Sequence, residues 1–147
     1  TVRELALHKA QEVAQTCAPE DIIIAADTIV YLDGAILGKP RDHDDAVRML
    51  TALSGREHIV YTGVAVLRGG ELRQAAERPA VRFRPLTPGE IERYIATGEP
   101  MDKAGAYGIQ GRGALFVAHL DGDYFNVMGL PLCRLGQLLN ELGVELL

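Results

Sequence analysis

The sequence predicts an α/β fold, with a mixed, elongated sheet flanked by helices. Segments in which apolar residues recur every three or four positions alternate with short β-branched runs, a pattern typical of this class. Asp33-Gly34 and Gly69-Gly70 each stand between two apolar runs as tight turns, so part of the sheet is antiparallel. With 147 residues, of which 48% are hydrophobic and 24% charged, the chain fits one domain covering residues 1–147.

The first part of the chain predicts a helix, a hairpin and a second helix. Val2 to Thr16 has helical periodicity. Ile22 to Leu37 predicts two strands joined by the first turn, and the continuous apolar run at its start indicates burial on both faces. Asp42 or Asp44 caps the next helix, which we expect to end near Gly55.

The middle of the chain predicts further strands. His58 to Leu67 is rich in valine and isoleucine and is interrupted by Thr62-Gly63. After the second turn comes a polar segment without a predicted element, and then Val81 to Phe83 alternates with arginines as a strand with one wet face.

The last part of the chain begins with a capping box. Thr87 to Glu90 has proline at the first helical position, and Gly98 ends the helix. The stretch from Glu99 to Gly113 is too rich in glycine for a long element, and Ala114 to Leu120 predicts another strand. A last helix follows, and its predicted buried face consists of Leu132, Leu135, Leu138, Leu139 and Leu142.

Charge and cysteine usage limit the function classes. The net charge of −5 is spread along the chain, which argues against a nucleic-acid surface, and the apolar runs are too short for a membrane span. Cys17 and Cys133 lack metal-ligand spacing, and a disulfide scaffold is not expected at this size, so a cytoplasmic location is the default. Because the chain begins with Thr1, we expect residues upstream to have been removed or left out.

Asp27 is the strongest candidate for a chemical role. An ionised carboxylate inside an apolar strand is costly unless it is paired, bound to a metal or placed at a water-filled cleft. The returning strand of the hairpin leads to Lys39, whose extended backbone before a proline aims its side chain reproducibly, so the two residues are expected to lie close together. The competing interpretations are a carboxylate that caps a neighbouring backbone and a solvated turn lysine.

Lys9 lies on the same helical face as Leu5 and Val13, which leaves two interpretations open. Its stem can pack while the ammonium group reaches water, and the spacing by itself favours this snorkelling arrangement. Alternatively, the ammonium group meets an anion beside the Asp27 strand.

Four further polar residues complete the candidates. Asp102 and Lys103 form either part of a site or a surface ion pair of little energetic weight. Gln110 lies between glycines that permit close ligand approach, and its amide can both donate and accept toward a base edge, although it could be a plain loop residue. Thr28 is by composition a β-branched strand residue.

The balance of these side chains indicates a phosphorylated ligand. Lysines outnumber carboxylates among the candidates, which fits a polyphosphate with a divalent cation, Mg²⁺ or Mn²⁺. Mg²⁺ needs only one or two carboxylates when waters and substrate phosphates supply its other ligands, and Asp27 is the candidate metal ligand. No P-loop, dinucleotide fingerprint, zinc quartet or nucleophile elbow is present in the sequence.

Six segments taken together resemble the Maf family of nucleoside triphosphate pyrophosphatases, and in particular its dTTP/UTP pyrophosphatase-like branch. The segments follow the family order almost from end to end. They are LALHKA (5–10), AADTIV (25–30), GKP (38–40), LSGREHIVYTGV (53–64), GEPMDKAGAYGIQG (98–111) and GDYFNVMGLPL (122–132).

The resemblance implies a fold similar to the inosine triphosphatase-type pyrophosphatases, and metal-assisted hydrolysis of a nucleoside triphosphate to the monophosphate and pyrophosphate. By the same resemblance Asp27 falls on the proton acceptor, and Lys9 and Lys39 on lysines that face the phosphates. Thr28 and Gln110 fall on positions tied to base choice. Glutamine at that last position resembles the dTTP and UTP branch, whereas glutamate is found in a branch acting on 7-methyl-GTP.

One part of the family pattern is missing from the chain. The family opens with a strand and a Ser-x-Ser-Pro-Arg-Arg loop that binds phosphate, and this chain begins after that loop, so the domain is expected to be incomplete at its N-terminus. The expected partner is a nucleoside triphosphate, without nucleic acid or membrane, and a homodimer is left open. Two other functions remain as alternatives: a nucleotide-binding regulator of cell division or septum formation, and a purine (inosine-type) triphosphate pyrophosphatase.

Overall fold

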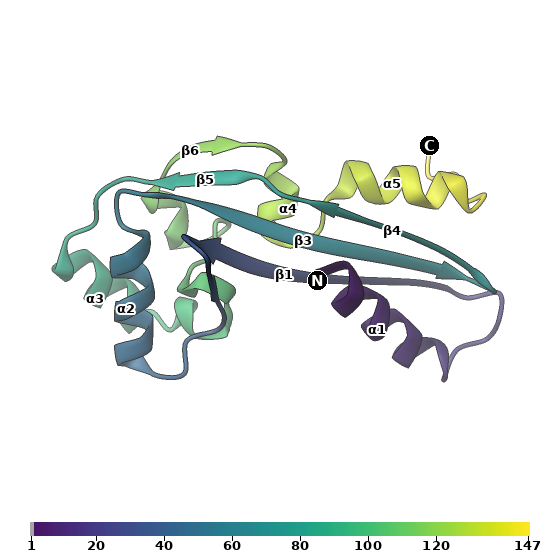
Figure 1. The fold of residues 1–147 in the computed structure, drawn as a ribbon, viewed down its shortest axis with the longest axis horizontal. Helices are drawn as coiled ribbons and strands as arrows, with labels where there is room; N and C mark the ends of the chain where they lie inside the picture. The colour runs from purple at the N-terminus through teal and green to yellow at the C-terminus, as the bar shows by residue number, and fades with distance from the viewer. Residues whose placement is uncertain (1) are drawn as a thin grey trace.

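The computed structural model describes residues 2–147. It contains a six-stranded sheet of order β2-β1-β3-β5-β6, in which β4 also pairs with β3 (Figure 1). The strands are β1 (Ile22–Leu32), β2 (Ala35–Leu37), β3 (Glu57–Arg68), β4 (Glu71–Glu77), β5 (Ala80–Phe83) and β6 (Val117–Asp121). The α-helices are α1 (Val2–Ala14), α2 (His43–Leu53), α3 (Pro88–Ala96), α4 (Tyr124–Met128) and α5 (Leu132–Glu141). The 3-10 helices are η1 (Glu99–Asp102), η2 (Ala104–Ala106) and η3 (Arg112–Phe116).

Helices flank the elongated sheet, which confirms the predicted α/β class (Figure 1). All pairings between the described strands are antiparallel, whereas the alternation of elements had also suggested parallel pairs. No helix among residues 2–147 is both long and apolar enough to cross a membrane.

The long ladder between β1 and β3 is the frame of the molecule. It runs from Ile22 opposite Arg68 to Tyr31 opposite Ile59 without a break, so the interruption predicted at Thr62-Gly63 is wrong. Glycine occurs at position 63 because the carbonyl of Val2 in α1 lies where a Cβ atom would be. The strand β3 therefore continues through Gly63, whose lack of a side chain leaves room for the backbone of α1.

The predicted burial of the start of β1 on both faces is also wrong. Ile22 and Ile24 are 42% and 45% exposed, and Ile23 between them packs against Ala6 and Ala10 of α1. This stretch of the strand has one covered face and one open face, as the period of two in a strand allows. On the neighbouring strand β3, α5 packs on the opposite face from α1, because Val64 and Val66 cluster with residues of α5 while Ala65 clusters with residues of α1.

Three elements differ from the prediction. β4 forms in the segment that was read only as polar, and residues 124–128 form the short helix α4. β6 begins at Val117 instead of Ala114, because η3 occupies the preceding residues. In α5 four of the five predicted leucines are buried, but Leu132 is 48% exposed.

The two predicted helix starts are confirmed in atomic detail. Asp42 accepts a hydrogen bond from the backbone N–H of Asp45 at 2.8 Å, which caps α2. Thr87 and Glu90 bond each other's backbone N–H groups, which completes the capping box of α3.

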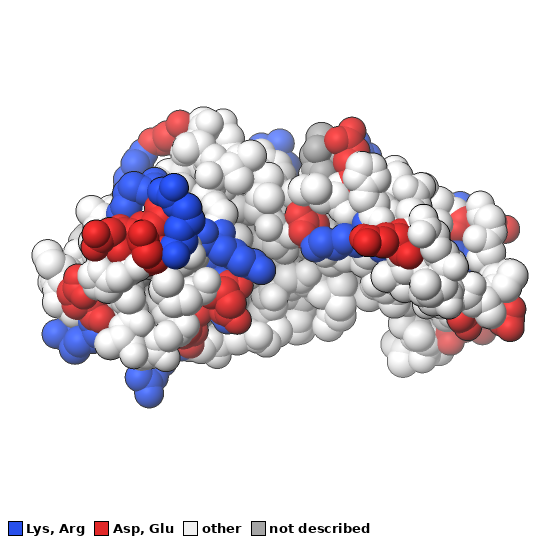
Figure 2. All heavy atoms as spheres, turned by 90° about the horizontal axis from the view of Figure 1, so that it is seen from below, with Lys and Arg blue, Asp and Glu red and all other residues white. Residues whose placement is uncertain are grey.

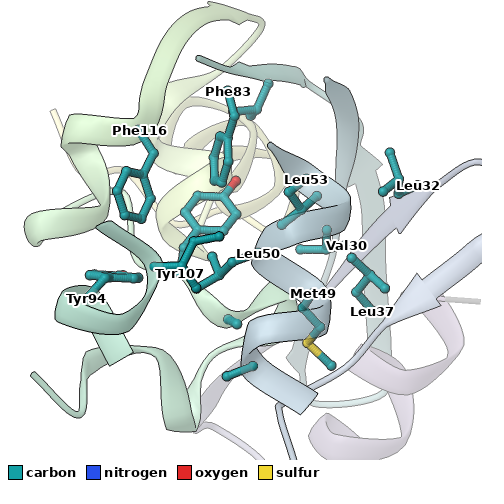
Figure 3. Packing of buried hydrophobic residues seen from close by; sticks show 14 of the residues in the cluster. Val30, Leu32, Leu37, Met49, Leu50, Leu53, Phe83, Tyr94, Tyr107 and Phe116 are labelled. Atoms are coloured by element: carbon teal, nitrogen blue, oxygen red, sulfur yellow. The ribbon is translucent and has the colours of Figure 1, made fainter. Parts of the chain in front are cut away.

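The largest apolar cluster lies between the sheet, α2, α3 and the segment that follows α3 (Figure 3). Leu50 of α2 packs there with Phe83 of β5, and the ring of Tyr107 stands edge-on to Phe83 with centroids 4.7 Å apart. Val30 of β1 belongs to the same cluster. This core fixes the segment after α3 against Val30 of β1, which also lines the cleft described next.

Candidate active site

A cleft of about 320 Å³ lies between α1, the middle of β1 and the glycine-rich segment after α3. This size is within the range of small-molecule sites. Figure 2 shows acidic and basic side chains gathered on both sides of the middle of the molecule. One group lies toward the end that carries α2 and α3, and the other toward the end that carries α1. All six residues predicted for the site line this one cleft: Lys9, Asp27, Thr28, Lys39, Lys103 and Gln110.

Asp27 projects from the centre of β1 opposite Gly63, and its side chain is 22% exposed. Lys9 of α1 reaches it, with Nζ 2.5 Å from Asp27 Oδ1 and 3.3 Å from the carbonyl oxygen of Ala26. The carboxylate inside the strand is therefore paired with a cation and lies at a cleft. Both features offset the free energy that it costs to remove an ionised carboxylate from water. The ammonium group of Lys9 contacts the Asp27 carboxylate itself, and the Lys9 side chain is 54% exposed.

Lys39 and Lys103 enter the cleft from the other side. Lys39 follows β2, and the carbonyl of the preceding Gly38 accepts a hydrogen bond from Gly105 at 3.1 Å, which ties the hairpin to η2. Lys103 donates to Asp102 at 2.9 Å, and this hydrogen bond holds the pKa of Asp102 below its ordinary value. Both members of the pair line the cleft, so the pair is part of the site wall as well as an ion pair.

Thr28 is held in place by a buried hydrogen-bonded chain that sequence reasoning missed. Its Oγ1 lies 2.9 Å from Oγ1 of Thr62, and Thr62 in turn donates to the carbonyl oxygen of Asn126 at 3.1 Å. Since the single hydroxyl hydrogen of Thr62 goes to Asn126, Thr28 is the donor to Thr62. The Thr28 hydroxyl thus keeps only acceptor capacity for a ligand in the cleft.

A second buried pair lies under the cleft. Nε2 of His58 is 2.7 Å from the hydroxyl of Tyr107, a cleft residue, and burial lowers the pKa of His58 to about 4. Burial likewise raises the pKa of Tyr107, so both groups are neutral near pH 7. Nothing in the sequence indicates this pair, because a histidine in a strand and a tyrosine 49 positions later become neighbours only through the fold.

Gln110 lies on a loop, residues 108–113, whose first three residues line the cleft and whose last two begin η3. Beneath this loop Glu99 accepts hydrogen bonds from the backbone N–H groups of Arg112 and Gly113, at 3.0 and 3.1 Å. The hydroxyl of Tyr94 also donates to Glu99 and accepts from the N–H of Gly108. Neither Glu99 nor Tyr94 is among the site residues predicted from the sequence.

The candidate metal ligands are two carboxylates in one cleft. Within residues 2–147 there is no cluster of three or more His, Cys, Asp or Glu side chains that would form an all-protein metal cage. Asp27 and Asp102 each accept a hydrogen bond from a lysine at Oδ1. Such a sparse donor set fits a cation that also binds substrate phosphates.

Comparisons with known proteins find a matching family and several similar relatives. Residues 1–142 match the family described as Maf-like protein. The chain is 53% identical over 148 residues to a protein of Dictyoglomus turgidum named dTTP/UTP pyrophosphatase, covering 99% of this chain and 76% of the relative. A relative of the same name from Moorella thermoacetica is 55% identical over 146 residues, covering 98% of this chain and 75% of the relative. A third, from Bacillus cytotoxicus, is 54% identical over 134 residues, covering 91% and 70% respectively.

Proposed function

This chain belongs to the Maf-like protein family, and from that premise we propose that it hydrolyses dTTP and UTP to the nucleoside monophosphate and pyrophosphate. The observation that carries the proposal is the convergence of three lysines, two carboxylates and a glutamine on one cleft. The relatives named above share the chain almost from end to end, and their printed name gives the two substrates. Neither a cell-division regulator nor an inosine-type enzyme is favoured by these relatives.

The proposed chemistry is attack of a water molecule on the α-phosphorus. A new oxygen–phosphorus bond forms, the bond from the α-phosphorus to the bridging oxygen breaks, and pyrophosphate leaves with the bonding electrons. Asp27 takes the proton of the water, because it is a carboxylate that faces the cleft from a rigid strand. Its hydrogen bond from Lys9 fixes the direction of the carboxylate.

The lysines supply positive charge where phosphate oxygens gain negative charge. Lys39 and Lys103 line the side of the cleft opposite Lys9, so a polyphosphate between them is flanked by cations on both sides. A divalent cation bound by Asp27 and Asp102 would add Lewis-acid stabilisation of the same oxygens. The metal and the individual residue roles are part of this proposal, as are the cytoplasmic location and the homodimer raised by the sequence.

A product assay tests the function directly. The full-length protein is incubated with dTTP, UTP, CTP, GTP and ITP at a fixed Mg²⁺ concentration, and the nucleotide products are separated by chromatography. We expect monophosphate and pyrophosphate from dTTP and UTP at the highest kcat/KM. Formation of diphosphate and inorganic phosphate, or a preference for ITP, would contradict the proposal, and binding of nucleotide without turnover would indicate a regulator instead.

A further inference from the structure

The loop that carries Gln110 is attached to the protein through its backbone. Three of its N–H groups, those of Gly108, Arg112 and Gly113, donate to side chains that lie under the loop. The acceptors are only two groups, the Tyr94 hydroxyl and the Glu99 carboxylate, and these two are hydrogen-bonded to each other. Both ends of the loop are thus joined to one connected pair of side chains.

At two positions of the loop, Gly111 and Gly113, there is no space for a side chain beside this pair. A Cβ atom at position 111 would collide with the Glu99 carboxylate, and one at position 113 would lie 2.5 Å from the carbonyl oxygen of Gly108 and 2.8 Å from the Tyr94 hydroxyl oxygen. Without side chains at these two positions the backbone can approach closely enough to donate its hydrogen bonds. The close approach makes the position of the loop depend on Glu99 and Tyr94 specifically.

The charge states of Glu99 and Tyr94 allow the two side chains to accept the hydrogen bonds of the loop backbone. Burial by itself would raise the pKa of Glu99, but the hydrogen bonds from Tyr94, Arg112 and Gly113 outweigh it and hold the pKa below its ordinary value. Burial raises the pKa of Tyr94, which therefore stays a neutral donor. An ionised carboxylate is an acceptor at all its lone pairs, so it can serve three donors at once.

We propose that Glu99 and Tyr94 are positioning residues that hold the 108–113 loop so that the Gln110 amide faces the base of the substrate. The inference rests on the proposed function and on the base-choice position that the family resemblance gives to Gln110. Glu99 and Tyr94 do not line the cleft, so their effect on substrate passes through the loop. A role confined to fold stability would not depend on whether Gln110 is present.

A double-mutant cycle separates these two roles. Glu99→Gln keeps the shape of the side chain but turns an amide N–H₂ toward backbone donors, and Glu71→Gln on β4 is the matched control at an exposed carboxylate. We expect Glu99→Gln to lower kcat/KM for UTP by about tenfold or more and to reduce the preference for UTP over CTP. In a Gln110→Ala background the same change should lower kcat/KM for UTP by less than about threefold, because the effects of mutating residues that act together are not additive. Equal losses in both backgrounds would overturn the proposal.

A second measurement needs no turnover and therefore distinguishes a failure of this inference from a failure of the proposed function. Hydrogen exchange of individual amides is followed in the ligand-free protein at a temperature where every variant is folded. We expect the amides of Arg112 and Gly113 to exchange about tenfold faster or more in Glu99→Gln, and that of Gly108 in Tyr94→Phe. Unchanged exchange in both variants would show that the pair does not hold the loop, whatever the enzyme hydrolyses. If the wild type hydrolyses neither dTTP nor UTP while the exchange rises as expected, the pair still positions the loop and only the base-reading role is overturned.

Discussion

Lys9 Nζ lies 2.5 Å from Asp27 Oδ1, and this contact joins α1 to the centre of the sheet at the floor of the cleft. The two residues are 18 positions apart in sequence, on different elements. The helical spacing of Lys9 allowed a solvated ammonium group or one that meets an anion beside the Asp27 strand, and the structure places the ammonium group on the carboxylate of Asp27 itself. In the proposed reaction this carboxylate accepts the proton, and whether Lys9 also acts on the substrate phosphates is tested below.

Replacing Asp27 by asparagine tests the proton acceptor. The change keeps the shape of the side chain and removes the charge, so we expect turnover of dTTP to fall by about 100-fold or more, as for the loss of a general base or metal ligand. The protein should stay folded, because an amide remains that can accept a hydrogen bond from Lys9. Turnover near the wild-type rate, measured by pyrophosphate release, would remove Asp27 from the mechanism.

Replacing Lys9 by methionine tests whether the ammonium group acts on the substrate. Methionine keeps an apolar stem, so we expect kcat/KM to fall while the midpoint of urea unfolding changes little. Arg3→Met, at an exposed position of the same helix, is the matched control for loss of a positive charge. If both variants keep the wild-type kcat/KM, Lys9 is a structural partner of Asp27 only.

The residues that the sequence singled out lie together in the fold, whereas parts of the sheet were not predicted. Each candidate that it singled out lines the cleft, because unusual residues such as Asp27 in an apolar run and Gln110 among glycines are visible locally. β4 was missed since its strand is polar and its one fully buried apolar residue, Ala75, is small. The exposure of Ile22 was missed because nothing local shows which face of a strand a helix will cover.

The supporting residues could not have been found from the sequence. Thr62 and Glu99 act through hydrogen bonds to residues that are distant in the chain, or to backbone N–H groups whose position depends on a loop conformation. Residues of these types are common in strands and turns of every class, so their identity carries no signal. Only the folded arrangement shows which of them contact the cleft wall.

The buried His58 predicts a pH dependence of stability. Burial lowers its pKa from 6.5 to about 4, so the unfolded chain binds a proton at a higher pH than the folded protein does. The free energy of unfolding should therefore be fully maintained above pH 6.5 and fall as the pH drops toward 4. The expected loss is about 3 kcal/mol across this window, as an order of magnitude.

Urea unfolding between pH 4.5 and 7.5 measures this dependence. His58→Gln cannot titrate, so its stability should decline less steeply in the window even if it is less stable throughout. His119→Gln, at an exposed strand position, should keep the wild-type slope. A wild-type slope in His58→Gln would assign the dependence to other groups.

Base choice is tested by Gln110→Glu. Uracil and thymine each present a ring N–H between two carbonyl groups, so a glutamine amide can donate to one carbonyl and accept from the N–H. An ionised glutamate is only an acceptor and would face a carbonyl with like polarity, whereas a guanine edge offers it an N–H and an amino group. The Thr28 hydroxyl, left as an acceptor by Thr62, also suits a ring N–H and should tune the same choice more weakly.

We therefore expect Gln110→Glu to lower kcat/KM for dTTP and UTP more than for GTP. Sites built to hydrogen-bond a substrate discriminate strongly, because the wrong ligand leaves polar groups unpaired. The ratio of kcat/KM for UTP to kcat/KM for GTP should therefore fall by about tenfold or more. The assay compares the variant with wild type on the nucleotide panel at fixed metal, with Gln137→Glu on α5 as the matched control. An equal fall on every base would mean that position 110 supports the cleft without reading the base, since a loss of general positioning affects all substrates alike.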